Sequence, residues 1–308
     1  MQLIETIFSL SFLSLVIRLA IPITLGAVGG TFSERSGVIN LGIEGMMLFG
    51  AFGAVLGTHL TSNPWMGVLS AMLIGGLVGI LHAYLSVKLK ANQVVCGVGI
   101  NMIASGFTTV MVKAVWGKEG MSGNVESIKN FNIPGLSQIP VLGALFSDLS
   151  PFVPITLFIV FAGWYFLYQT KLGLRLRSIG DYPKAAETAG IRVNRYRYIF
   201  VTLSGALAGL GGAYLSIVQN NLFVRDMVAG RGFMALTANI FGGWNPLGSF
   251  VASLVFAAAQ ALRLNLSGYQ ILDSLIQMIP YAVTLLVLIL AGRKTKAPAA
   301  LGEVDTVA

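Results

Sequence analysis

The sequence predicts an all-α, polytopic integral membrane protein with about eight to ten transmembrane helices, some of them broken or half-spanning. Three observations predict this class. Of the 308 residues, 55% are hydrophobic and only 10% are charged, whereas about a quarter of the residues of a soluble domain are charged. The apolar residues gather in runs of roughly 20, the length that crosses a bilayer as a helix. Basic residues stand between these runs, where they set the orientation of a membrane protein.

The transmembrane spans are predicted from the apolar runs. We place them at 7–29, 38–57, 65–87, 92–116, 152–169, 198–218, 231–243, 247–265 and 273–292. The run 231–243 is too short to cross alone, because thirteen residues at about 1.5 Å each extend roughly 20 Å, against about 30 Å of hydrocarbon. We therefore expect a half-helix there, or a segment shielded by its neighbours.

We expect a single transmembrane domain over residues 1–296 and a disordered cytoplasmic tail over 297–308. Thirteen of the twenty Lys and Arg are Arg35, Lys88, Lys90, the seven in 170–197, and Arg293, Lys294 and Lys296. The positive-inside rule places these residues in the cytoplasm. Nine crossings then put the N-terminus outside and the C-terminus inside, and make 117–150 an ordered external loop.

The basic segment 170–197 is predicted to carry a short capped helix. Asp181 is a suitable N-cap, Pro183 fits the first turn, and Gly190 can end the helix. The residues between them include Ala185, Ala186 and Ala189, which favour helix. A capped helix in a cytoplasmic loop is typical of a docking point for a soluble partner. The alternative is a long loop that serves orientation only.

Two segments of the chain resemble each other. Residues 34–57 and 229–250 are both glycine-interrupted apolar runs that follow a charged turn. Paired broken segments often mark the central pathway of a transporter. One interpretation is a two-fold internal repeat, and the other is chance, since glycine is common in membrane helices.

Polar residues inside the apolar runs are the candidates for a translocation pathway. Asn101 either lines a cavity or bonds a neighbouring helix. Glu44 could cap a broken helix, pair with a cation such as Arg18, or face a water-filled lumen. Asn40 and Asn239 occupy roughly matching places in the two broken segments.

Small residues predict close helix packing. Ser204, Ala208 and Gly212 recur every four residues, as do Gly205, Gly209 and Ala213. Both rows lie on one helical face, where they allow another helix to approach closely.

Several function classes find no support in the sequence. No GxxxxGK[ST] motif is present, so we expect no ATP hydrolysis by this chain. His59 and His82 have no partner at metal-ligand spacing, and the single cysteine, Cys96, excludes an internal disulfide. The net charge of +8 lies at membrane edges, which indicates lipid contact rather than nucleic-acid binding. Since Glu44 is the one clear carboxylate inside a span, we expect the driving energy to come from a partner.

Three segments carry a family resemblance: ERSGVINLGIEGMMLFGAF at 34–52, LRSIGDYPKAAETAGI at 176–191 and GRGFMALTANIFGGWNPLGS at 230–249. The chain resembles the permease subunits of ABC importers in the branched-chain amino acid, ribose and simple-sugar group. It is most similar to the subgroup that imports nucleosides with a basic-membrane-protein-type binding lipoprotein. The middle segment resembles the loop by which such permeases contact their ATPases.

The resemblance implies partners and a location. Two ATPase subunits would bind ATP on the cytoplasmic side, so this chain would hold no cofactor of its own. A second permease chain, different and longer, would complete the pathway, and a binding lipoprotein would deliver solute from outside. The membrane would be a bacterial or archaeal cytoplasmic membrane.

The resemblance also implies roles for individual residues. The ATPase-coupling helix would comprise Gly180, Asp181, Pro183, Ala185, Ala186, Glu187 and Gly190. The broken-helix motif near the pathway is matched by Gly37, Asn40, Gly42, Glu44 and Gly45.

The expected function is therefore alternating access for a small neutral solute, most simply a nucleoside, driven by a separate ATPase. Spans with few amides and no arginine cluster suit a neutral solute better than a phosphorylated one. The alternatives are a simple sugar or a vitamin as solute, an ion-coupled secondary carrier, and a membrane scaffold that transports nothing.

Overall fold

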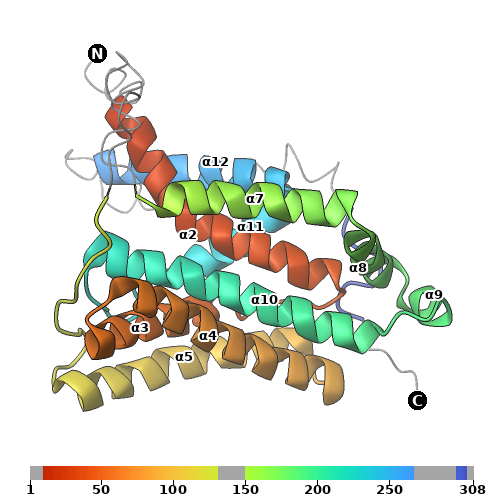
Figure 1. The fold of residues 1–308 in the computed structure, drawn as a ribbon, viewed down its shortest axis with the longest axis horizontal. Coiled ribbons are helices and arrows are strands. Elements are labelled where there is room, and N and C mark those ends of the chain that lie inside the picture. Colours follow the sequence, from red (N-terminus) through yellow and green to blue (C-terminus); the bar gives the residue numbers. More distant parts are fainter. Residues whose placement is uncertain (1–9, 131–149, 267–295, 304–308) are drawn as a thin grey trace.

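The computed structural model describes residues 10–130, 150–266 and 296–303. In these residues the regular structure is helical, and the one isolated β-bridge joins two loop positions, Met121 and Val224. Figure 1 shows the helices running side by side along the long axis of the molecule. The all-α, polytopic prediction is confirmed.

Seven helices in the described residues are long and apolar enough to cross a membrane. They are α2 (Leu10–Arg35), α3 (Ile43–Thr61), α4 (Pro64–Ala83), α5 (Gln93–Trp116), α7 (Phe152–Gln169), α10 (Val193–Ala213) and α12 (Pro246–Leu266). Helices α4 and α10 each continue as a π-helical turn, over Tyr84–Lys88 and Tyr214–Asn220. The predicted span 273–292 lies outside the described residues.

Three shorter helices complete the described fold. They are α8 (Lys171–Asp181), α9 (Pro183–Thr188) and α11 (Arg231–Phe241). Helix α11 is the predicted short segment, and its eleven residues extend only about 16 Å. Figure 1 shows α8 and α9 together at one end of the bundle, where α7 ends and α10 begins.

Two predicted boundaries in the first third of the chain are wrong. Helix α2 continues to Arg35 instead of ending at residue 29, and α3 begins at Ile43 instead of residue 38. The paired glycines at the predicted end of α2 lie within the helix, because close packing requires them there: a Cβ on Gly29 would lie 2.9 Å from the carbonyl oxygen of Ser204. The chain turns later, at Gly37, whose φ of +89° favours glycine.

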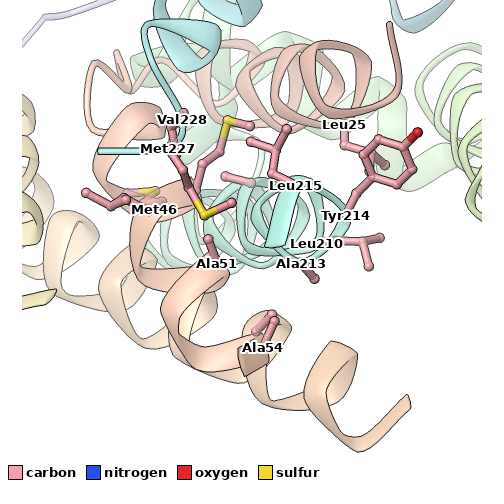
Figure 2. Close-up of a cluster of buried hydrophobic side chains, with 14 of the residues drawn as sticks. Leu25, Met46, Ala51, Ala54, Leu210, Ala213, Tyr214, Leu215, Met227 and Val228 are labelled. Atoms are coloured by element: carbon pink, nitrogen blue, oxygen red, sulfur yellow. The ribbon is translucent and has the colours of Figure 1, made fainter. Parts of the chain in front are cut away.

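The centre of the bundle is built on small residues of α10. A Cβ added to Gly205 would collide with the backbone of Gly75 in α4, and one added to Gly212 would collide with the backbone of Met47 in α3. The predicted close approach of helices is therefore confirmed. Figure 2 shows the adjoining apolar core, in which Met46 and Ala51 of α3 lie near Met227 and Val228 of the stretch that precedes α11 and near α10.

Candidate functional site

Two non-helical stretches enter the bundle, one after α2 and one before α11. Residues 36–42 follow the end of α2, and Asn40 in this stretch donates a hydrogen bond to Ser204. Ser204 lies eleven residues beyond the start of α10, or about 16 Å along the helix. The stretch 36–42 therefore lies deep in the bundle. Irregular backbone at membrane depth is stable only where its polar groups find partners inside the protein.

Side chains of α4, α5 and α10 supply partners for the stretch 36–42 and the first turn of α3. Asn101 of α5 bonds the backbone twice: its amide donates to the Leu41 carbonyl at 3.0 Å, and its oxygen accepts from the Gly45 N–H at 2.8 Å. The Asn40 oxygen accepts from the Gly42 N–H at 3.1 Å. Gln93 of α5 accepts from the Ile39 N–H, His82 of α4 bonds the Ile39 carbonyl, and Arg197 of α10 donates to the Ser36 carbonyl.

Of these side chains, His82, Gln93 and Arg197 were not expected to have a role. His82 is fully buried, and its imidazole lies 2.9 Å from the Ile39 carbonyl. Arg197, counted among the cations of a loop, is 4% exposed and donates to the Ser36 carbonyl. One pattern in the sequence could have indicated these roles. Polar side chains occur near the ends of spans, and a Gly-rich segment needs hydrogen-bond partners for its backbone.

Glu44 joins the two entering stretches. Its two carboxylate oxygens accept from the backbone N–H groups of Gly230, at 2.8 Å, and Gly232, at 2.7 Å. These N–H groups lie at the start of α11, where the helix dipole favours negative charge. Of the three alternatives for Glu44, the observed one is capping of a short helix. A Cβ on Gly232 would lie 2.5 Å from the Glu44 backbone, so glycine is required for this contact.

We call Glu44, Gly45, Asn101, Gly230 and Gly232 the junction. Here the first turns of α3 and α11 meet, with Asn101 of α5 alongside. The side chain of Phe233, next in sequence to Gly232, is 46% exposed. The junction thus brings polar backbone groups and a carboxylate together, with the exposed Phe233 ring next in sequence.

Asn239 lies in a second buried polar cluster, nearer the end of α2. The buried Glu34 carboxylate accepts from the Asn239 amide at 2.9 Å and from the Trp244 indole N–H. Thr31 donates to the Asn239 oxygen at 2.7 Å. This cluster ties α2 to α11 and to the turn before α12. Glu34 was missed as a candidate, although an acid at the end of an apolar run is a recognisable signal.

The four predicted pathway residues therefore have different settings. Asn40 and Asn239 are fully buried and hydrogen-bonded between elements. Glu44 and Asn101 are only partly buried and belong to the junction. Contact with a solute stays a prediction for all four.

The predicted coupling helix is present in part as α9, because two of its predicted residues, Gly180 and Asp181, belong to α8. Asp181 is not the N-cap of α9: Asp181 is the last residue of α8, and Tyr182 precedes α9 in a non-helical conformation. Pro183 disfavours helical conformation in the residue before it, so the break falls at Tyr182. The predicted stop is confirmed, because Gly190 has φ +80° and its N–H donates to the Glu187 carbonyl. Most of the predicted loop 170–197 is helical, in α8, α9 and the first turn of α10.

Helix α9 has a buried face and an exposed face. Ala186 is 3% exposed and packs with Ile179 of α8 and Val193 of α10. Asp181, Ala185 and Glu187 are exposed. Because α9 is anchored on both flanking helices, a force on its exposed face would be transmitted to them.

The expectation of a disordered tail from residue 297 does not hold for 298–302. The Ala300 N–H donates to the Gly180 carbonyl at 2.9 Å, and the Gly302 N–H donates to the Gly37 carbonyl at 3.0 Å. Ala300 is 3% exposed. This tail segment connects the end of α8 to the beginning of the stretch 36–42.

Known proteins share this architecture. Residues 12–291 match the family described as "Branched-chain amino acid transport system / permease component". The chain belongs to this permease family. It is a multi-pass membrane protein with the helical content and spans described above.

Relatives with assigned names cover most of the chain. The guanosine ABC transporter permease protein NupQ of Bacillus subtilis is 41% identical over 281 residues, covering 87% of this chain and 88% of the relative. The nucleoside ABC transporter permease protein NupC of Lactococcus lactis is 40% identical, covering 91% and 92%. The putative glucose ABC transporter permease protein TsgC13 of Haloferax volcanii is 35% identical, covering 84% and 78%.

A solved structure shares the fold. A chain of the PsaBC complex of Streptococcus pneumoniae with a Fab aligns with TM-score 0.54 and 16% identity, over 95% of this chain and 96% of that chain. At this identity the likeness concerns the fold alone.

Proposed function

We propose that this chain is the permease subunit of an ABC importer and that its solute is a nucleoside. The observation that carries the proposal is the similarity of about nine-tenths of the chain to two permeases named for guanosine and nucleoside transport, at 41% and 40% identity. A single transmembrane domain over residues 1–296 would form its half of the pathway.

The ATPase subunits are proposed to dock on the exposed face of α9. Ala185 and Glu187 of α9 are exposed, as is Asp181 at the adjoining end of α8, and Ala186 packs against α8 and α10. This assignment makes the α8–α9 end cytoplasmic, in agreement with the seven Lys and Arg of 170–197. A second permease and an external binding lipoprotein complete the proposed assembly, and ATP is bound by the partners.

A contiguous set of contacts links α9 to the junction. Movement of α9 displaces α8, and the Gly180 carbonyl of α8 is bonded to Ala300 of the tail segment. The tail segment is bonded to Gly37 through Gly302, and Gly37 begins the stretch that leads to Glu44. In the proposed mechanism, ATP-driven motion of α9 therefore shifts the stretch 36–42 and changes the side to which the junction opens.

The junction favours a neutral solute. Both Glu44 oxygens and both polar groups of Asn101 already bond backbone, whereas the Phe233 ring is half exposed. An aromatic ring offers a face on which a nucleobase can stack. Glucose is the second candidate solute, because TsgC13 is named for it.

The test is uptake by the complete complex in proteoliposomes with internal ATP. Radiolabelled guanosine is expected to accumulate, with excess unlabelled glucose unable to compete. Competition by glucose and not by nucleosides would favour the sugar. Uptake by the chain alone under an ion gradient would favour a secondary carrier, and partner binding without any uptake would favour a scaffold.

The coupling role is tested by the double variant Asp181→Ala/Glu187→Ala. We expect solute-stimulated ATPase activity to fall at least tenfold, the scale of losing about 1.4 kcal/mol of interaction. The matched control is Glu119→Ala/Asp226→Ala, which removes two exposed carboxylates that belong to neither α8 nor α9. Equal activity of the two variants, with normal assembly, would contradict the docking role of α9.

A further inference from the structure

A cavity of the described surface lies beside α9 and is not used by the proposed mechanism. Its volume is about 680 Å³, and it is lined by residues of α7, α8 and α10 and by the turn after α9. Figure 1 shows these elements meeting at the α8–α9 end of the bundle. A cavity of this size is large enough for a small organic group.

Three guanidinium groups line the cavity. Arg175 comes from α8, Arg192 immediately precedes α10, and Arg195 lies in the first turn of α10. Among the residues that the structure describes, none of the three forms an ion pair with a carboxylate. The carboxylates of the same region, Asp181 and Glu187, do not line the cavity. The cavity is therefore suited to an anion, and guanidinium groups bind phosphate well.

The rest of the lining is apolar and belongs to membrane-spanning helices. Phe166 lies near the end of α7, and Ile199 and Phe200 lie in the second turn of α10. Ile199 is 51% exposed, and Leu172 of α8 is 48% exposed. The cavity thus joins a cationic part, near the end of the bundle, to an apolar part that begins within the spans.

We propose that this cavity binds the headgroup of an anionic phospholipid, with the phosphate among Arg175, Arg192 and Arg195 and an acyl chain along Ile199. The combination of charge and apolar surface favours this occupant. A free phosphate has no use for the apolar part, and a soluble ATPase would have to reach residues of the spans. Anionic lipids are attracted to basic residues at the cytoplasmic face of membrane proteins.

The bound lipid would lie against the coupling helix. Ala189, Gly190 and Ile191, which follow α9 directly, also line the cavity. An occupied cavity would thus support the C-terminal end of α9 from the membrane side. The proposal does not depend on the solute or on the ATPase.

The test is native mass spectrometry of the full chain purified in mild detergent, titrated with phosphatidylglycerol or with phosphatidylcholine of the same acyl chains. The wild-type chain is expected to retain phosphatidylglycerol selectively. The variant Arg175→Gln/Arg192→Gln/Arg195→Gln should lose that preference at least tenfold, since each basic residue near the surface contributes about 1 kcal/mol to anionic lipid binding. Inorganic phosphate should not displace the lipid.

A matched control separates this site from general positive charge. Lys88→Gln/Lys171→Gln/Lys184→Gln removes three exposed cations that do not line the cavity, and it should bind phosphatidylglycerol as the wild type does. Leu172→Trp, which keeps the charge but fills the cavity, should weaken binding. Melting temperatures equal to that of the wild type establish that the variants fold.

Three results would overturn the proposal. Equal loss in both triple variants would mean that net charge alone attracts the lipid. Displacement by inorganic phosphate would assign the arginines to a phosphate site. Release of the lipid when the ATPase subunits are added would assign the cavity to the protein partner.

Discussion

The junction and the α8–α9 pair both carry the polar residues that the sequence singles out, but they use them in opposite ways. At the junction, Glu44 and Asn101 bond backbone groups that would otherwise be unpaired. In the α8–α9 pair, Asp181 at the end of α8 and Glu187 of α9 are exposed to the surroundings. The difference shows that irregular backbone within the bundle needs polar side chains as hydrogen-bond partners. Exposed polar side chains on an anchored helix are instead available to a partner protein.

The largest expected effect in this comparison is that of Asn101→Ala at the junction. The substitution leaves the Leu41 carbonyl and the Gly45 N–H without their partner. An unsatisfied buried group costs about 1–3 kcal/mol, so we expect the free energy of unfolding to fall by about 2–6 kcal/mol for the two groups together. Thermal unfolding in detergent measures this loss. Asn194→Ala, at an exposed position of α10, is the control and should leave stability unchanged.

If Asn101→Ala unfolded at the same temperature as the control, the junction would not depend on this side chain. Its role would then be confined to the pathway, and uptake of the solute by the variant would decide that role.

A smaller effect is expected from Gly232→Ala. The new Cβ would lie 2.5 Å from the backbone of Glu44, so α11 must move away from α3. Overpacking of this kind costs about 1–3 kcal/mol. We expect reduced uptake together with reduced thermal stability. The control is Gly99→Ala, whose Cβ meets nothing within 4 Å; a Gly232→Ala variant that transports as well as this control would contradict the tight contact between the two first turns.

The smallest effect on stability is expected from Gly190→Ala in the α8–α9 pair. Its Cβ would meet nothing within 4 Å, but φ at this position is +80°. A left-handed backbone costs a non-glycine residue about 1–2 kcal/mol. We expect that strain to loosen the end of α9 and to lower coupled ATPase activity more than thermal stability. A larger loss of stability than in Gly232→Ala would reverse the order of rigidity inferred for the two regions.

From the sequence, helix α9 could be predicted but α8 was missed, and the contacts of the junction were predicted less well. Pro183 and Gly190 mark α9 because proline and glycine act on the local backbone. The presence of α8 was missed, although Thr170 caps it through the Gly173 N–H and its inward residues recur at helical spacing. Cations dominated the composition of that segment and suggested a loop.

The junction depends on contacts between segments far apart in the chain. Glu44 and Gly230 are 186 residues apart, and no local pattern reveals which of three roles the carboxylate takes. The predicted end of α2 at residue 29 was too early, and the packing of Gly29 against Ser204 of α10 is visible only in three dimensions. The sequence thus predicts which residues are unusual, and the fold determines what each one bonds.

Cysteine cross-linking tests most directly the central claim that α9 receives the ATPase. Cys96, the single native cysteine, is first replaced in a Cys96→Ser background. In the assembled complex, a short bifunctional reagent is predicted to join the Glu187→Cys variant to an ATPase subunit and to leave the Asp226→Cys variant unlinked. A cross-link to the ATPase from Asp226→Cys, with none from Glu187→Cys, would contradict the account.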